Sequence, residues 1–224
     1  MKEKLKVREL YAYPEHSLAY PYLSRCEYPW EILPQITDLI LEIGAGLPKE
    51  EYDRVGEDVW ISKQATVAPT ASISGPCIIG HGAEIRHCAF IRGSALVGAG
   101  AVVGNSTELK NCILFDGVQV PHYNYVGDSV LGYKSHMGAG AVTSNVKSDK
   151  SDVVVHAMGE QILTGRRKFG AMLGDFVEVG CGSVLNPGTV IGSHSNVYPL
   201  SAVRGYVPKK SIFKAPNNIV AKHD

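Results

Sequence analysis

From residue 55 onward, an aliphatic residue recurs at every sixth position of this chain. A first series stands in strict register: Val55, Ile61, Val67, Ile73, Ile79, Ile85, Ile91, Val97, Val103, Leu109. A second series follows an irregular middle: Leu173, Val179, Leu185, Ile191, Val197, Val203. A period of six fits neither an α-helix nor a simple alternating strand. It is typical of a short strand plus a tight turn, three times per triangular coil of about eighteen residues. The pattern predicts an all-β fold, a parallel β-helix with the aliphatic residues inside.

Residues 1–54 lack this period and form a predicted N-terminal extension, with the β-helix domain spanning 55–224. Tyrosines and prolines between residues 11 and 29 predict an extended, irregular segment. Apolar residues from Trp30 to Ile43 have helical spacing, and the GAG at 44–46 ends the helix. An open β-helix end exposes strand edges, so we expect this short helix to cap that end. A helix that binds a partner is the alternative.

The period is broken between residues 113 and 172, where we expect function, because regular coils need only packing. The second part of this break, residues 146–172, is a predicted insertion. Residues 204–224 break the period again and mix lysines with apolar residues. We expect them to form a C-terminal cap that seals the other end of the β-helix.

Composition narrows the classes of function. Lys+Arg and Asp+Glu both number 22, and this zero balance excludes a broad nucleic-acid or membrane-binding surface. The five cysteines are an odd count without a C-x-x-C pair, which argues against a disulfide framework or a structural zinc site. No stretch reaches eighteen apolar residues, so a cytoplasmic protein is expected. The 24 glycines fit the turns of the predicted coils.

Two stretches, PHYNYVGDSVLG and GAGAVTSN, resemble the acetyltransferase half of bifunctional N-acetylglucosamine-1-phosphate uridylyltransferases. TGRRKFGAMLGD resembles the related archaeal sugar-1-phosphate nucleotidylyltransferases. The resemblance implies a left-handed β-helix of the hexapeptide-repeat acyltransferases, assembled as a homotrimer. It also implies an acetyl-CoA-dependent N-acetyltransferase that acts on the amine of a hexosamine 1-phosphate and needs no metal. Residues 1–54 do not resemble a uridylyltransferase domain, so a free-standing acetyltransferase is expected.

The resemblance also assigns site residues. The catalytic residues are His122, as the base, and Ala139, whose backbone N–H contacts the acetyl carbonyl. The substrate-binding residues are Arg92, Lys110, Tyr125, Asn145 and His136, the last standing where the family has an Asn. The positions that line coenzyme A are Ala139, Cys181 and Pro199. Lys147 and Lys150 are both candidates for a family lysine that follows Asn145.

Elementary chemistry agrees with these roles. Arg92 and Lys110 are eighteen residues apart, which stacks them on one face about 4.8 Å apart. Two stacked cations suit a phosphate monoester, although two solvated surface charges are the alternative. An imidazole such as that of His122 is largely neutral at pH 7 and can accept the proton of an attacking amine, unless it only orders a loop. Backbone donors at Gly138–Gly140 can stabilise an oxyanion.

Lys168 belongs to a cationic cluster, Arg166–Lys168, that could meet phosphates of coenzyme A or of the substrate, or form a solvated loop tip. Two rival functions stay open. A γ-carbonic-anhydrase-like metalloenzyme would draw zinc ligands from His81, His87, His122 and His136. A non-catalytic scaffold or regulatory subunit would bind a sugar phosphate or nucleotide sugar without releasing thiol from acetyl-CoA.

Overall fold

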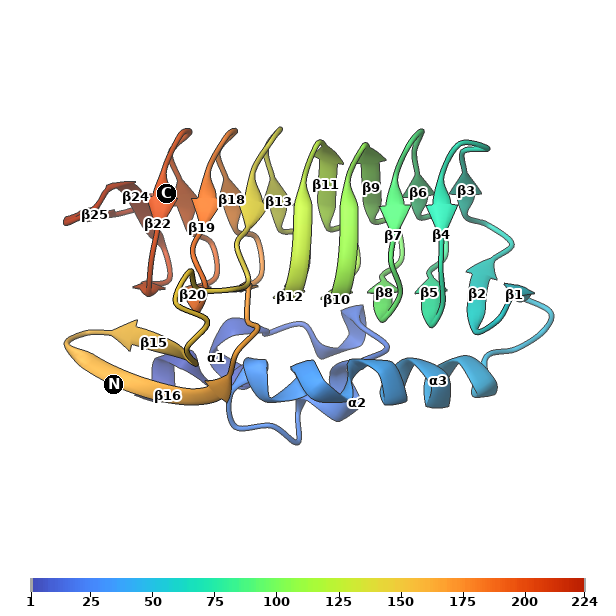
Figure 1. Cartoon of the computed structure of the whole chain (residues 1–224), viewed down its shortest axis with the longest axis horizontal. Coiled ribbons are helices and arrows are strands. Elements are labelled where there is room, and N and C mark those ends of the chain that lie inside the picture. Colours follow the sequence, from blue (N-terminus) through green and yellow to red (C-terminus); the bar gives the residue numbers. More distant parts are fainter. Residues whose placement is uncertain (1, 224) are drawn as a thin grey trace.

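The computed structural model describes residues 2–223 and shows a β-helix with helices along one side (Figure 1). The stacked strands form three faces, and pairing between coils is parallel. One face, which we call the helix-covered face, contains β2 (Val59–Ser62), β5 (Cys77–Ile79), β8 (Ala95–Val97), β17 (Ala171–Leu173), β20 (Thr189–Ile191), β23 (Tyr206–Val207) and the second halves of β10 (Glu108–Leu114) and β12 (Tyr125–Leu131).

The other two faces are named after residues that point outward from them. The Tyr125 face contains β4 (Ser72–Ile73), β7 (Phe90–Ile91), the first halves of β10 and β12, β14 (Val142–Thr143), β19 (Val184–Leu185) and β22 (Ala202–Val203). The His136 face contains β3 (Thr66–Val67), β6 (Glu84–Ile85), β9 (Val102–Asn105), β11 (Gln119–His122), β13 (His136–Met137), β18 (Glu178–Val179), β21 (Asn196–Val197) and β24 (Ser211–Ala215).

The six-residue period marks the interior, as predicted. The aliphatic residues of the repeat from Ile79 to Val203 are buried, most of them completely. Val55 is an exception, because it is 60% exposed on β1 (Tyr52–Gly56), which pairs antiparallel with β2 outside the coils. The β-helix therefore begins at β2. The left-handed sense of the coil stays a prediction.

The irregular middle proves more regular than the sequence pattern suggested. The inward residues Leu109 and Leu114 are five positions apart, as are Val126 and Leu131, while the strands β10 and β12 run through without a break. Each of these coils has lost one residue at the same edge of the prism. The true interruption comes later, where an antiparallel hairpin of β15 (Val153–Ala157) and β16 (Glu160–Arg166) leaves the coil.

The N-terminal residues form a layer of short helices along the helix-covered face. They are η1 (Lys2–Leu5), α1 (Val7–Leu10), η2 (Pro14–His16), α2 (Tyr20–Leu23), the 3-10 helix η3 (Pro29–Gln35) and α3 (Ile36–Gly46). Within the expected extended, irregular segment, η2 and α2 form two short helices, and the residues around them are turns, bends and irregular backbone. The expectation that the helix caps an open end is wrong, because α3 packs along the side against β5, β8 and β10.

The helices lie along this face because of the strands that form it. Their outward side chains are apolar, as in Ile78, Leu96, Ile113, Val130 and Met172, and every one is fully buried. Burying such a column against the helices removes apolar surface from water along the whole length of the prism, which is worth more than covering one end. Leu10 and Trp30 are among the residues that the helical layer contributes to this core.

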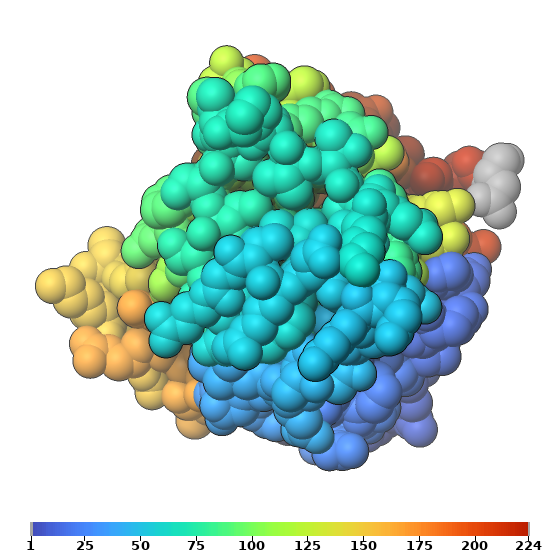
Figure 2. All heavy atoms as spheres, turned by 90° about the vertical axis from the view of Figure 1, so that its right-hand side faces the viewer, coloured from blue at the N-terminus to red at the C-terminus, as the bar shows by residue number. Residues whose placement is uncertain are grey.

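The two ends are covered by strands. Figure 2 looks at the end that carries β1 and β2, where residues coloured cyan face the viewer and the blue N-terminal layer lies to one side. At the other end, the coil continues through β23 and β24 before β25 (Asn218–Ala221) turns back antiparallel to β24. The expected C-terminal cap from residue 204 is therefore partly a continuation of the β-helix. No helix among residues 2–223 has the length and apolar character needed to span a membrane.

Candidate active site

The predicted catalytic and coenzyme residues form one row along the edge between the His136 face and the Tyr125 face. The backbone N–H of Gly140 donates to the carbonyl of His122 at 2.9 Å, which stacks Ala139 on His122 in the next coil. Gly182 donates to Ala139 at 2.8 Å, and Leu200 donates to Cys181 at 2.9 Å. Residues that are far apart in the sequence thus follow one another from coil to coil. We call this row, which ends at Pro199, the His122 edge.

The chemistry that this edge offers is a free imidazole beside free backbone donors. The side chain of His122 is exposed, and its ring nitrogens have no hydrogen-bond partner among residues 2–223. Ala139 is exposed as well, and within the same described residues no acceptor takes its N–H. A base that is free to accept a proton and an N–H that is free to meet an oxyanion are the two groups that acyl transfer to an amine requires.

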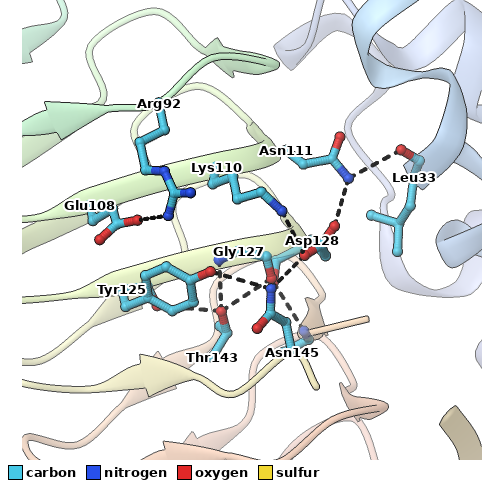
Figure 3. A network of polar contacts seen from close by, with 12 residues as sticks. Leu33, Arg92, Glu108, Lys110, Asn111, Tyr125, Gly127, Asp128, Thr143 and Asn145 are labelled. Carbon is cyan, nitrogen blue, oxygen red and sulfur yellow. Dashed lines mark hydrogen bonds and ion pairs between the residues drawn. The ribbon is translucent and has the colours of Figure 1, made fainter. Parts of the chain in front are cut away.

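Four predicted sugar and phosphate contacts, Arg92, Lys110, Tyr125 and Asn145, lie together on and beside the Tyr125 face (Figure 3). Glu108 on β10 pairs with Tyr125 on β12, and Lys110 pairs with Gly127. The N–H of Arg92 donates to the carbonyl of Leu109 at 2.9 Å, so Arg92 stands one coil before Lys110. The two cations are therefore stacked on one face, as the spacing predicted.

Both cations are paired with carboxylates. Nη1 of Arg92 is 2.7 Å from Oε1 of Glu108, and Nζ of Lys110 is 3.7 Å from Oδ2 of Asp128. The hydrogen bond that Arg92 donates to Glu108 raises the pKa of Arg92 above its usual value, so this group stays charged. Arg92 keeps further N–H donors beyond the one that Glu108 uses. The face therefore presents alternating charges, which can bind sugar hydroxyls as well as a phosphate.

Asp128 connects three successive coils. Its side chain is 5% exposed, accepts a 2.8 Å hydrogen bond at Oδ1 from Nδ2 of Asn111, and accepts another at Oδ2 from Nδ2 of Asn145. Asn111, Asp128 and Asn145 are separated by seventeen positions each. Because each of these coils is one residue shorter, the three side chains stack at one edge of the prism, which we call the Asp128 edge. Nδ2 of Asn111 also donates to the carbonyl of Leu33 at 3.2 Å, which ties the edge to η3 in the helical layer (Figure 3).

Tyr125 is held over the same edge. Nδ2 of Asn145 donates to its hydroxyl oxygen at 3.2 Å. Burial, together with the negative charges of Asp128 and Glu108, raises the pKa of Tyr125, so its phenol is neutral and can donate to a ligand. Glycine below the ring lets Tyr125 take this position, because a Cβ at Gly127 would lie 2.4 Å from the Tyr125 hydroxyl oxygen.

Two predicted site residues lie apart from these groups. His136 is on the His136 face, where its Nδ1 is 2.8 Å from Oε2 of Glu178 in the following coil. Lys168 lines a cavity with Asp128 and Asn111 at the Asp128 edge, not with Cys181 and Pro199. The structure thus places Lys168 beside the predicted acceptor contacts rather than in the predicted coenzyme row.

The histidines considered as zinc ligands also do not converge within this chain. His81 hydrogen-bonds to Ser62 at 2.7 Å and Glu51 at 3.1 Å, and His87 hydrogen-bonds to Thr70 at 2.9 Å. No group of three metal-ligating side chains that could hold an ion occurs in residues 2–223.

Sequence reasoning did not single out Glu108, Asn111 or Asp128. Asp128 lies inside the stretch that carried the resemblance, directly after Gly127. A sequence signal for its partners exists, since Asn111, Asp128 and Asn145 are polar residues at a constant spacing of seventeen. Their polar contacts depend on the tight edge, which only the coil geometry reveals.

Comparison with known proteins places the chain among related enzymes. Residues 73–198, more than half of the chain, match the family model of the GMPPB C-terminal domain. A bifunctional sugar-1-phosphate nucleotidylyltransferase/acetyltransferase from Sulfurisphaera tokodaii is 37% identical over 109 residues, which are 49% of this chain and 27% of that protein. The bifunctional protein GlmU of Methanococcus aeolicus is 32% identical over 212 residues, which are 87% of this chain and 47% of that protein.

Among solved structures, the acetyltransferase domain of PglB from Neisseria gonorrhoeae, in complex with acetyl coenzyme A, is 21% identical with a TM-score of 0.38. That similarity covers 73% of this chain and 57% of the other chain. The chain spans between about a quarter and a half of the length of the two bifunctional relatives. The family-model match contains the Asp128 edge and all of the His122 edge except its last residue, Pro199. On the family-model match, this chain belongs to the GMPPB C-terminal domain family.

Proposed function

We propose that this protein is an N-acetyltransferase that moves an acetyl group from acetyl-CoA to the amine of a hexosamine 1-phosphate. The observation that carries the proposal is the stacking of Ala139 on His122, which sets an unpaired N–H beside an unpaired imidazole at an exposed edge. The relatives support the class of reaction, because one of them is named as a bifunctional sugar-1-phosphate nucleotidylyltransferase/acetyltransferase.

In the proposed reaction, the amine nitrogen attacks the thioester carbonyl carbon while His122 accepts a proton from that nitrogen. The carbonyl oxygen becomes an oxyanion, and the N–H of Ala139 donates to it. The carbon–sulfur bond then breaks, and the coenzyme thiolate takes the proton from His122. The products are the N-acetyl sugar and free coenzyme A, so no covalent enzyme intermediate is needed.

The Tyr125 face holds the acceptor in this proposal. Tyr125, Asn145 and the carboxylate of Glu108 bind sugar hydroxyls, while Arg92 and Lys110 bind the phosphate. Holding both substrates in register lowers the barrier by proximity. A homotrimer in which neighbouring subunits close the coenzyme path is part of the proposal, and light scattering in solution tests it.

The test is release of coenzyme A from acetyl-CoA, followed with a thiol reagent, on glucosamine 1-phosphate and glucosamine. We expect turnover of both and a clear preference for the phosphate. Equal turnover would overturn the phosphate contact with Arg92 and Lys110. Binding of the sugar phosphate without any thiol release would instead establish the non-catalytic alternative.

A further inference from the structure

The cationic residues Arg166, Arg167 and Lys168 line a cavity of about 220 Å³ at the Asp128 edge. One wall is Leu33 and Pro34 of the helical layer, and the other is formed by Asn111 and Asp128. Arg166 ends β16, the last strand of the inserted hairpin, and Arg167 and Lys168 follow it, so the insertion returns to the coil at this cavity. We refer to it as the edge cavity.

Arg166, Arg167 and Lys168 differ from Arg92 and Lys110, because no carboxylate in the described part of the chain neutralises their charge. Among residues 2–223, no carboxylate forms an ion pair with Arg166, Arg167 or Lys168, although ion pairs are frequent elsewhere on the surface. Nε of Arg167 donates to the carbonyl of Lys150 at 3.2 Å, which holds this side chain against the base of the insertion. Its terminal N–H groups are left for a ligand.

The carboxylate of Asp128 does not cancel this charge. Lys110 and the amides of Asn111 and Asn145 already engage its two oxygens. The edge cavity therefore carries an excess of positive charge inside a protein whose net charge is zero. Adjacent guanidinium and ammonium groups at a concave site are a typical arrangement for phosphate oxygens.

The position of the edge cavity indicates which phosphate it takes. Tyr125 and Asp128 are three strand residues apart, so about 10 Å separates the two sides of the Tyr125 face. In a 2-amino sugar, only a few covalent bonds separate the amine from the phosphate on the first carbon. An acceptor whose amine lies at His122 therefore places its first phosphate over Arg92 and Lys110. Nζ of Lys110 is 3.7 Å from Oδ2 of Asp128, so this phosphate lies at the rim of the edge cavity and does not occupy it.

We propose that Arg166, Arg167 and Lys168 bind the second phosphate of a diphosphate-linked amino sugar, such as a nucleoside diphosphate sugar. This inference rests on the proposed acetyl transfer for the position of the amine. A cavity of about 220 Å³ accommodates a phosphate group and leaves the attached nucleoside outside. Coenzyme A is not the expected ligand, because the edge cavity lies across the Tyr125 face from the row that ends at Pro199.

Steady-state kinetics with glucosamine 1-phosphate, UDP-glucosamine and acetyl-CoA test this assignment in the full-length chain. We expect a lower KM for UDP-glucosamine than for glucosamine 1-phosphate. In Arg166→Ala and Lys168→Ala, the KM for UDP-glucosamine should rise about tenfold or more, because a charge-assisted contact is lost. The KM values for glucosamine 1-phosphate and acetyl-CoA should stay within about twofold. Lys222→Ala, a half-buried cation after β25, is the matched control.

Calorimetric titration with inorganic pyrophosphate separates this inference from the proposed activity. Binding to the wild type that weakens in Lys168→Ala supports the phosphate subsite even if no sugar is acetylated. Equal binding in both proteins, or no binding, overturns the subsite while the acetyl transfer can still stand. If Arg166→Ala and Lys168→Ala raised only the KM for acetyl-CoA, the subsite would be overturned as well, because the cations would then bind the coenzyme.

Discussion

Nδ2 of Asn111 lies 2.8 Å from Oδ1 of Asp128, although seventeen residues separate them in the chain. The same amide reaches the carbonyl of Leu33, so one asparagine connects the β-helix edge to the helical layer. With Lys110 and Asn145 on its other oxygen, Asp128 holds three coils and the N-terminal layer in one network. The residues predicted to bind the acceptor therefore depend on a carboxylate that need not touch the acceptor.

Removal of that carboxylate should destabilise the fold. Asp128→Ala removes the carboxylate that two amides and the Lys110 ammonium share, and breaking a buried charged network of this kind costs about 3 kcal/mol. Urea unfolding measures the loss. Asp152→Ala, an exposed acid on the insertion, should change the free energy of unfolding by less than about 0.5 kcal/mol. If both variants lowered the free energy of unfolding equally, Asp128 would not connect the coils as described.

Substitution of the proposed base should affect chemistry and not folding. His122→Ala is expected to lower kcat for coenzyme A release by about a hundredfold or more. Its midpoint of thermal unfolding should stay close to that of the wild type, because the imidazole is exposed and has no partner among residues 2–223. His87→Ala provides a control, since His87 is an exposed histidine that the backbone ladder places on the same edge, two coils earlier. Unchanged turnover in His122→Ala would exclude the base.

Adding a single methyl group at residue 127 tests the packing under the ring of Tyr125. In Gly127→Ala, the new Cβ would lie 2.4 Å from the Tyr125 hydroxyl oxygen, so the ring must move away from Asn145. We expect the KM for the sugar acceptor to rise several-fold with little change in the KM for acetyl-CoA. Gly46→Ala is the control, because a Cβ there meets nothing within 4 Å. A shared rise in both KM values would point to a general distortion of the coil.

The stability of the fold should depend on pH through Asp175. This carboxyl is completely buried where the N-terminal layer meets the coil, and burial raises its pKa from 3.8 to about 6, against the two N–H bonds from Ala12 and Tyr133. The folded state therefore holds a proton that the unfolded state has released between about pH 4 and pH 6. The contribution of Asp175 is fully present below pH 4 and is lost as the pH rises through 6.

Urea unfolding between pH 4 and pH 7 measures this dependence against Asp175→Asn, which does not ionise. The free energy of unfolding of the wild type minus that of the variant should fall with rising pH and then level off above about 6. A difference that rises with pH would mean that the two backbone donors outweigh burial and lower the pKa of Asp175.

The sequence alone determined the β-helix, because a six-residue period of aliphatic residues has no other way to bury one side of every strand. It also determined that Arg92 stacks on Lys110, since residues one coil apart must share a face. The outward apolar residues Ile78, Leu96 and Ile113 carried a further signal, because a face that is apolar on both sides must be covered. The expectation of a capped end did not use this signal, and the structure shows a covered face instead.

Only the tertiary structure decided where the helices lie and which polar groups meet. The period could not show that two coils are one residue shorter at the Asp128 edge, because a single missing residue resembles a break in the pattern. That shortening brings Asn111, Asp128 and Asn145 into contact. The inserted hairpin has no period of its own, so the placement of Lys168 beside Asp128 followed from packing between distant segments and not from local sequence.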